Sequence, residues 1–116
     1  MKIKNQQFSR REYWAVDFDG TLCEHRFPDI GNPKQQVIDV IRRAHERGVC
    51  IIIWTCRSGE FIPPMQEWLK RNNIPYDYIN ENPECNFTTS PKIYADKYID
   101  DRACSLQEVA MWRLSN

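Results

Sequence analysis

The sequence predicts an α/β fold with a mainly parallel sheet, and three observations carry this prediction. A continuous β-branched apolar run, Val49–Trp54, fits a strand that is buried on both faces. Apolar segments of strand length alternate along the chain with segments whose apolar residues recur at helical spacing. Polar residues follow directly after several of these strand segments. Such alternation is typical of parallel strands joined by helical crossovers.

The first strand and the first helix have clear boundary signals. We expect a loose amino-terminal arm over residues 1–11 and then a strand over Tyr13–Phe18. Asn32 can cap the following helix, and Pro33 suits its first turn. Gly48 suits its exit, because glycine readily adopts the left-handed conformation that ends many helices.

The second half of the chain continues the alternation. After the buried strand we expect a helix over Phe61–Asn72, a short strand over Tyr76–Ile79 and a polar loop over Asn80–Ser90. A fourth strand, Asp96–Ile99, precedes a last helix opened by Ser105, which forms the capping-box pattern S-x-x-E with the glutamate three residues later. With no linker or repeat in sight, residues 12–116 are predicted to form a single domain.

Composition excludes several classes of function. The chain has 116 residues, with 16 lysines and arginines against 16 aspartates and glutamates, so no global field favours nucleic acid. The opening segment lacks the apolar core of a signal peptide, and the longest apolar run is too short to span a bilayer. The five cysteines form no C-x-x-C pair, so we expect reduced thiols and a cytoplasmic protein without a membrane partner.

Acidic and polar residues gather where the predicted strands end. Asp17 and Asp19 follow the first strand, Thr55 follows the second, and Asp100 and Asp101 follow the fourth. Ligands of open parallel sheets bind beyond the carboxyl ends of the strands. We therefore expect these residues to meet at one edge of the sheet. Carboxylates so close together repel, and a shared hard cation such as Mg²⁺ resolves the repulsion.

These residues resemble the haloacid dehalogenase (HAD) superfamily, in its phosphatase branch. "DFDGT" at Asp17–Thr21 looks like the first signature, D-x-D-G-T, and "IIIWT" looks like the second, a strand that ends at Thr55. Lys92 matches the third signature, and "YIDD" at Tyr98–Asp101 matches the fourth. The four signatures occur in the expected order. The resemblance implies a three-layer Rossmann-like (HAD-type) fold around a mainly parallel central sheet.

The resemblance also implies a mechanism, that of a phosphomonoester hydrolase acting through an aspartyl-phosphate. Asp17 would be the nucleophile, and Asp19 would be the general acid and base. Thr55 and Lys92 would bind the phosphate oxygens. Mg²⁺ would be held by the carboxylates of Asp17 and Asp100 and by the backbone carbonyl of Asp19.

Supporting roles are implied for two further residues. Asp101 would orient a metal-bound water or the catalytic lysine, and Thr21 would help to orient Asp19. Lys97 is a rival for the third signature, but it lies inside the predicted last strand. Lys92, on a loop or helix start, therefore suits the role better.

The spacing leaves no room for the cap domain that many members of this superfamily carry. A capless site is open, so a macromolecular substrate covers it, a neighbouring subunit of a homo-oligomer covers it, or its specificity is loose. The phosphorylated substrate is then a small molecule or a macromolecular phosphate end. Positive charge for contacting it could come from four residues: His25, Arg26, Arg57 and Arg102.

Two other interpretations of the same residues stay open. The first is a non-catalytic phosphate-binding or regulatory module on the same fold. The second is a receiver domain of a response regulator, which also combines acids, a threonine and a lysine on a parallel sheet. A receiver needs its phospho-accepting aspartate at the end of a middle strand, and that strand here ends in Thr55.

Overall fold

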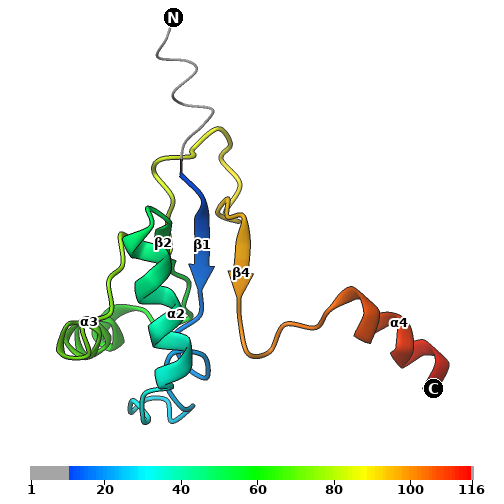
Figure 1. Ribbon diagram of the computed structural model, residues 1–116, viewed down its shortest axis with the longest axis horizontal. Coiled ribbons are helices and arrows are strands. Elements are labelled where there is room, and N and C mark those ends of the chain that lie inside the picture. Colours follow the sequence, from blue (N-terminus) through cyan, green and yellow to red (C-terminus); the bar gives the residue numbers. More distant parts are fainter. Residues whose placement is uncertain (1–10, 116) are drawn as a thin grey trace, which may run out of the picture.

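The computed structural model describes residues 11–115, so most of the predicted amino-terminal arm lies outside the described residues. The element order alternates strands and helices as expected (Figure 1). The elements are β1 (Tyr13–Val16), α2 (Gln35–Glu46), β2 (Cys50–Ile53), the 3₁₀ turn η1 (Gly59–Phe61), α3 (Ile62–Arg71), β3 (Tyr78–Ile79), β4 (Lys97–Ile99) and α4 (Leu106–Ser115).

The sheet is parallel throughout and has the strand order β3-β2-β1-β4. Ala15 at its centre is in register with Ile52 of β2 and with Tyr98 of β4. The predicted α/β class, with a Rossmann-like parallel sheet, is therefore confirmed. This order places β1 beside β4, so the first and last strands of the sheet end next to each other (Figure 1).

The main core lies between one face of the sheet and the two helices α2 and α3. Its fully buried members from these elements are Val16, Ile51 and Ile53 from the strands, Ile38 and Ile41 from α2, and Met65 and Leu69 from α3. Burying each such side chain contributes about 1.5–3 kcal/mol. This cluster is what fixes both helices against the strands.

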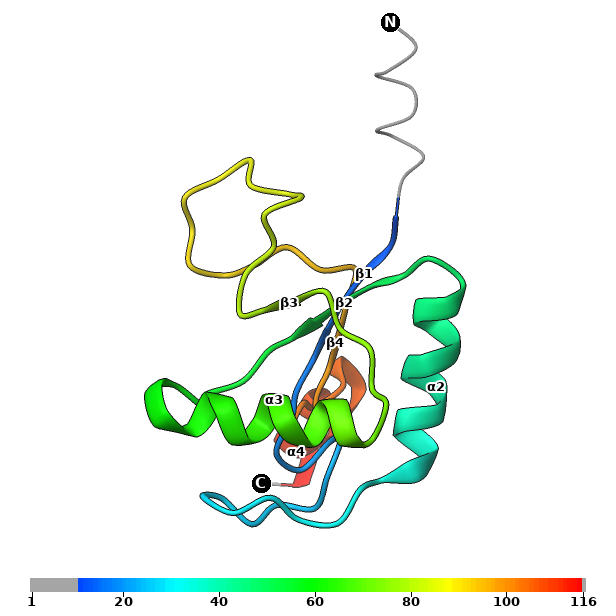
Figure 2. The same ribbon diagram turned by 90° about the vertical axis from the view of Figure 1, so that its left-hand side faces the viewer.

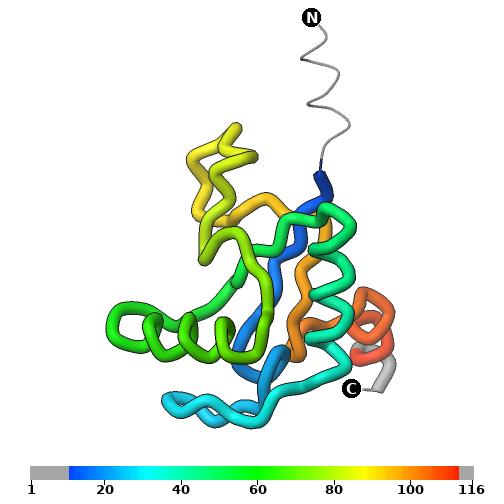
Figure 3. Tube along the Cα trace, turned by 60° about the vertical axis from the view of Figure 1, so that its left-hand side comes forward, coloured from blue at the N-terminus to red at the C-terminus, as the bar shows by residue number. Residues whose placement is uncertain are grey.

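A smaller cluster covers the opposite face. Tyr13, Cys50 and Ile52 point to that side and contact Cys85 and Ile93 from the connection between β3 and β4. In Figure 2 this connection, drawn in yellow, and α2 lie on opposite sides of the strands. Helix α4 follows β4 and lies at the other end of the molecule from α3 (Figures 1 and 3).

Aspartates also fix the amino-terminal ends of the strands. Asp96 accepts a hydrogen bond from the N–H of Tyr13 at 2.7 Å, and Asp77 accepts one from the N–H of Ile51 at 2.9 Å. Each carboxylate therefore satisfies a backbone donor of a neighbouring strand. This arrangement helps to set where pairing begins.

The predicted start of the first helix is wrong by two residues, because the N-cap position is Lys34 and not Asn32. Asn32 does not cap α2, which begins at Gln35 with no side-chain cap. The carbonyl of Asn32 instead accepts the N–H of Glu24 at 2.8 Å, and the N–H of Lys34 donates to the carbonyl of Leu22 at 2.9 Å. This local pairing of two loop segments holds residues 32–34 out of the helix.

The other helix signals act as the sequence suggests. Gly48 follows α2 with φ +97°, as expected of a glycine that ends a helix. Prolines occupy the first turn of α3. The capping box of α4 is formed by reciprocal hydrogen bonds of 3.0 Å, from Ser105 N–H to the Glu108 side chain and from Glu108 N–H to the Ser105 hydroxyl.

Three further observations bear on the expectations from composition. Within residues 11–115, the connections on either side of β2 hold no folded unit besides α2, η1 and α3. No helix in that part of the chain is long and apolar enough to cross a membrane. All five cysteines are free thiols.

Candidate functional site

The carboxyl ends of β1 and β4 bring three carboxylates together. The N–H of Asp17 donates to the carbonyl of Ile99 at 2.9 Å, so the chain stays paired up to the point where both strands end. One side-chain oxygen each of Asp17, Asp100 and Asp101 then lies within 4.8 Å of the other two. The predicted convergence of these distant segments at one sheet edge is thus present in the structure.

A cavity of about 330 Å³ lies at this edge. Its lining comes from the ends of β1, β2 and β4 and from the loop after β1: Asp17, Asp19, His25, Phe27, Thr55, Cys56, Arg57, Asp100, Asp101 and Arg102. Seven residues that the sequence analysis proposed as catalytic, metal-binding or substrate-contacting therefore line this cavity, together with Asp101. Arg26 and Lys92 are not among the lining residues.

The carboxyl of Asp17 has an unusual pKa for an aspartate. The pKa of Asp17 is raised to about 7: partial burial is the largest cause, the neighbouring acids Asp100 and Asp101 add to the rise, and the Thr21 hydroxyl opposes it. The shift reflects a carboxyl that is partly buried and also lies among like charges. Such a cluster of hard oxygen ligands fits Mg²⁺, whose charge would relieve the repulsion.

Thr21 connects two of these acids. Its hydroxyl lies 3.1 Å from Asp17 Oδ2 and 3.3 Å from Asp101 Oδ1, and it accepts the N–H of Asp101 at 3.0 Å. The resemblance assigned Thr21 to orienting Asp19, whereas the structure places its hydroxyl against Asp17 and Asp101. Gly20 permits this close packing, because a Cβ there would lie 2.5 Å from Asp101 Oδ2.

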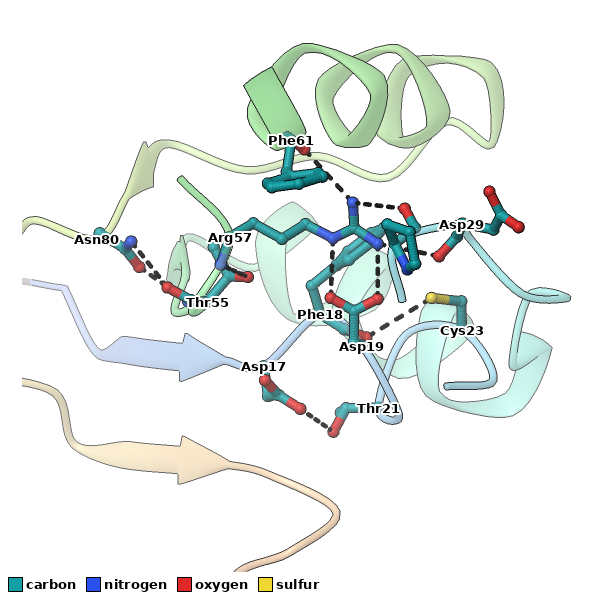
Figure 4. A network of polar contacts seen from close by, with 11 residues as sticks. Asp17, Phe18, Asp19, Thr21, Cys23, Asp29, Thr55, Arg57, Phe61 and Asn80 are labelled. Atoms are coloured by element: carbon teal, nitrogen blue, oxygen red, sulfur yellow. Dashed lines mark hydrogen bonds and ion pairs between the residues drawn. The ribbon is translucent and has the colours of Figure 1, made fainter. Parts of the chain in front are cut away.

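The Asp19 side chain points toward Arg57 and away from Asp17 (Figure 4). Arg57 Nε donates to Asp19 Oδ2 and Nη2 donates to Oδ1, both at 2.8 Å. The Arg57 side chain is only 1% exposed. The expectation that Arg57 contacts substrate is therefore corrected: its guanidinium is buried in an ion pair, although the residue lies at the cavity wall.

Thr55 is held in place by a residue that the sequence analysis missed. The Asn80 side chain accepts the N–H of Thr55 at 2.8 Å and donates to its carbonyl at 2.9 Å. The Thr55 hydroxyl accepts the N–H of Arg57 at 3.0 Å, and its own hydrogen can still be donated into the cavity. Asn80 follows the short β3 with φ +56°, and an asparagine after a strand was the available signal.

Neither candidate lysine lies at the cavity. Lys92 Nζ lies 5.2 Å from the centre of the Tyr98 ring, and Lys92 lines a separate hollow of about 370 Å³ that residues of the connection between β3 and β4 form. Lys97 is exposed on β4 and pairs with Glu12 at 3.1 Å. Lys34, which the sequence analysis did not single out, donates to the carbonyl of Gly20 at 2.7 Å, beneath the turn that carries Asp19.

Two cavity residues had no assigned function in the sequence analysis. Phe27 is about half exposed, and its ring lies 5.0 Å both from the Arg57 guanidinium and from the Phe61 ring. Cys56 is exposed at the cavity wall. Only its position next to Thr55 could have indicated this.

Arg102 supplies its N–H to Asp100 Oδ1 at 2.9 Å and so orients that carboxylate.

Fold and site together define an α/β protein with an acidic pocket at the carboxyl ends of parallel strands. No family model and no curated protein matches the chain. A solved structure described as the conserved protein coded by a locus from Bacteroides thetaiotaomicron is 33% identical, with a TM-score of 0.73 over 81% of this chain and 78% of that one. The chain belongs to the same family as that conserved protein.

A second solved structure is similar in fold. It is described as the Pnkp1/Rnl/Hen1 RNA repair complex, and it matches with a TM-score of 0.61 and 22% identity. The match covers 92% of this chain but 40% of that one. At this identity the likeness concerns the fold.

Proposed function

We propose that the protein is a Mg²⁺-dependent phosphomonoester hydrolase of the HAD superfamily, acting through an aspartyl-phosphate. The observation that carries the proposal is the shared cavity, in which Asp17, Asp19, Thr55 and Asp100 come together from three strand ends. The order of the four sequence signatures supports it independently.

Asp17 is suited to act as the nucleophile. It follows directly after the central strand β1, it faces the cavity, and the Thr21 hydroxyl holds one of its oxygens at 3.1 Å. Asp17, Asp100 and Asp101 would hold Mg²⁺, with the Asp19 carbonyl as the further ligand that the resemblance implies. The ion would neutralise the repulsion between an anionic nucleophile and an anionic phosphate.

The reaction then needs two proton transfers, and Asp19 would perform both. An oxygen of Asp17 attacks phosphorus while the bond to the leaving oxygen breaks, and Asp19 gives that oxygen a proton. Water next attacks the acyl phosphate, Asp19 takes a proton from the water, and phosphate leaves Asp17 free. Thr55 would donate its hydroxyl hydrogen to a phosphate oxygen throughout.

The substrate class follows from the openness of the cavity and from its charges. His25 and Arg102 line it beside the acids and would attract an anionic phosphate ester. We propose a phosphorylated small molecule or a macromolecular phosphate end as substrate. The likeness to a component of an RNA repair complex favours including nucleic-acid phosphate ends in any substrate screen. A homo-oligomer and a cytoplasmic location remain part of this proposal.

The decisive experiment is hydrolysis of an aryl phosphate with and without Mg²⁺. Wild type should turn over only with the cation, and Asp17→Asn should lose at least about 10³-fold because no nucleophile remains. Asp39→Asn, on the exposed side of α2, is the matched control and should keep wild-type activity. Equal rates for wild type and Asp17→Asn would reject the proposal.

Two observations favour keeping a phosphate-binding module without turnover as the second candidate. Lys92 lies outside the cavity lining, and Asp19 is engaged by Arg57. Calorimetric titration with inorganic phosphate, with and without Mg²⁺, separates the candidates. Mg²⁺-dependent affinity without hydrolysis of any phosphoester in a broad panel would favour the binding module.

A further inference from the structure

The Arg57 guanidinium has a partner for every N–H group that it carries. Nε and Nη2 hold the two oxygens of Asp19 at 2.8 Å. Nη2 also donates to the Asp29 carbonyl at 3.1 Å, and Nη1 donates to the carbonyls of Pro28 and Phe61 at 3.4 Å. An arginine has five N–H donors. The contacts therefore use its full capacity, and none is left for a substrate phosphate.

The guanidinium is also enclosed by aromatic rings. It lies 5.3 Å from the centre of the Phe18 ring and 5.0 Å from that of Phe27, distances at which a cation is attracted to a ring face. Backbone carbonyls from the loop after β1 and from η1 fix it from the remaining sides (Figure 4). These contacts therefore hold the Arg57 guanidinium in one orientation independently of its ion pair with Asp19.

The two hydrogen bonds from Arg57 hold the Asp19 carboxylate in a direction that differs from that of the Asp17 carboxylate. The Asp17 carboxylate lies against Thr21 and the cluster with Asp100 and Asp101, while the Asp19 carboxylate faces Arg57 (Figure 4). The Asp19 side chain keeps 14% exposure and remains part of the cavity wall. A proton donor must sit beside the leaving oxygen, and not beside the attacking one, and rates fall steeply when it is displaced.

We propose that Arg57 is a positioning residue that holds Asp19 on the leaving-group side of the cavity. The inference rests on the proposed function and deepens it. In the step concerned, Asp19 enters as the carboxylic acid; the bridging oxygen takes the electron pair of its breaking bond to phosphorus together with the Asp19 proton, and Asp19 is left as a carboxylate. Arg57 touches neither of these reacting atoms and acts only through Asp19.

Leaving groups of different basicity make the role measurable. A nitrophenolate departs without a proton, whereas an alkoxide needs one. The informative quantity is kcat/KM, which includes steps up to the departure of the leaving group and excludes the later attack by water. Arg57→Lys keeps a positive charge but cannot form the two-pronged contact. It should lower kcat/KM by about 10–100-fold for the best alkyl phosphate of the screen and by less than about 3-fold for p-nitrophenyl phosphate.

Three further variants make the comparison specific. Arg42→Lys is the matched control, because Arg42 also ties two segments together through carbonyls, at 2.9 Å to Asn73 and 2.5 Å to Asn72, but lies outside the cavity lining. It should leave the ratio of the two substrates unchanged. Asp19→Asn should show the same preference for the aryl substrate, and adding Arg57→Lys to it should cost little more, because both changes remove one function.

The outcomes separate the two proposals. A ratio measured within one preparation does not depend on the fraction of folded protein, so partial unfolding of Arg57→Lys cannot imitate the result. Equal losses for both substrates, no loss for either, or additive losses in the double variant overturn the positioning role and leave the hydrolase intact. No turnover by the wild type overturns the proposed function, and this inference with it.

Discussion

Asp17 is the residue in which the chemistry of the site and the stability of the protein meet. Its pKa is raised to about 7 by burial first and then by Asp100 and Asp101. In the unfolded chain the same carboxyl has an ordinary pKa near 3.8. The folded state therefore binds one more proton than the unfolded state between these two values. By linkage, the contribution of Asp17 to the free energy of unfolding is most favourable below the lower value and falls as the pH rises toward the higher one.

This linkage predicts the effect of removing the charge. Without divalent cations, Asp17→Asn and the wild type should have the same free energy of unfolding near pH 4. At pH 8 the variant should be more stable by about 1 kcal/mol after a discount for solvent screening, or roughly 4 °C in Tm. Thermal unfolding from pH 4 to pH 8 in a chelating buffer measures this. A difference in Tm that does not change with pH would show that ionisation of Asp17 does not destabilise the folded state.

At the scale of elements, the turn after β1 is more constrained than the turn after α2. Gly20 and Gly48 have nearly the same φ, +95° and +97°. A Cβ on Gly48 would meet nothing within 4 Å, whereas a Cβ on Gly20 would reach the Asp101 carboxylate. The two glycines therefore separate backbone strain from packing at the site.

Alanine substitutions at these two turns should differ accordingly. Gly48→Ala should lower the free energy of unfolding by about 1–2 kcal/mol, which is the cost of placing an alanine in the left-handed conformation. Gly20→Ala should lower the free energy of unfolding by more than that. It should also weaken Mg²⁺ binding, because Asp101 must move. Denaturant unfolding and calorimetric titration with Mg²⁺ report the two effects. Equal destabilisation with unchanged Mg²⁺ affinity would contradict the tight packing of Gly20 on Asp101.

At the scale of the whole molecule, the site joins segments from both ends of the domain. Asp17 lies near its start and Asp100 near its end, and only the adjacency of β1 and β4 brings them together. A cation held between them binds the folded chain and not the unfolded one. Its binding free energy therefore adds to the free energy of unfolding of the entire domain.

Mg²⁺ should consequently stabilise the wild type by an amount that rises with the logarithm of its free concentration above Kd, about 2.7 kcal/mol at 100 times Kd. Asp100→Asn should show a much smaller response to the same concentration. Urea unfolding at neutral pH, with Mg²⁺ or with a chelator, measures this difference. A wild-type midpoint that ignores Mg²⁺ would argue against the three-carboxylate site.

The order of elements and the edge of the sheet could be predicted because each depends on patterns within short segments. The apolar run before Thr55 and the acids after β4 identify strand ends, and parallel strands bring such ends together. The Arg57–Asp19 pair could not be predicted, since it depends on side-chain directions across 38 residues. Asn32 failed as a helix cap because loop pairing, invisible in the local pattern, engaged its backbone.

The two ends of the sheet use the same amino acid for different purposes. At the amino-terminal end, Asp77 and Asp96 accept backbone hydrogen bonds from neighbouring strands. At the other end, Asp17 and Asp100 crowd together around a cavity. Pairing of the strands and the proposed chemistry at their tips therefore depend on separate sets of carboxylates. Natural variation could thus retune the reactive set, changing the ion or the ester accepted, while the strands kept their register.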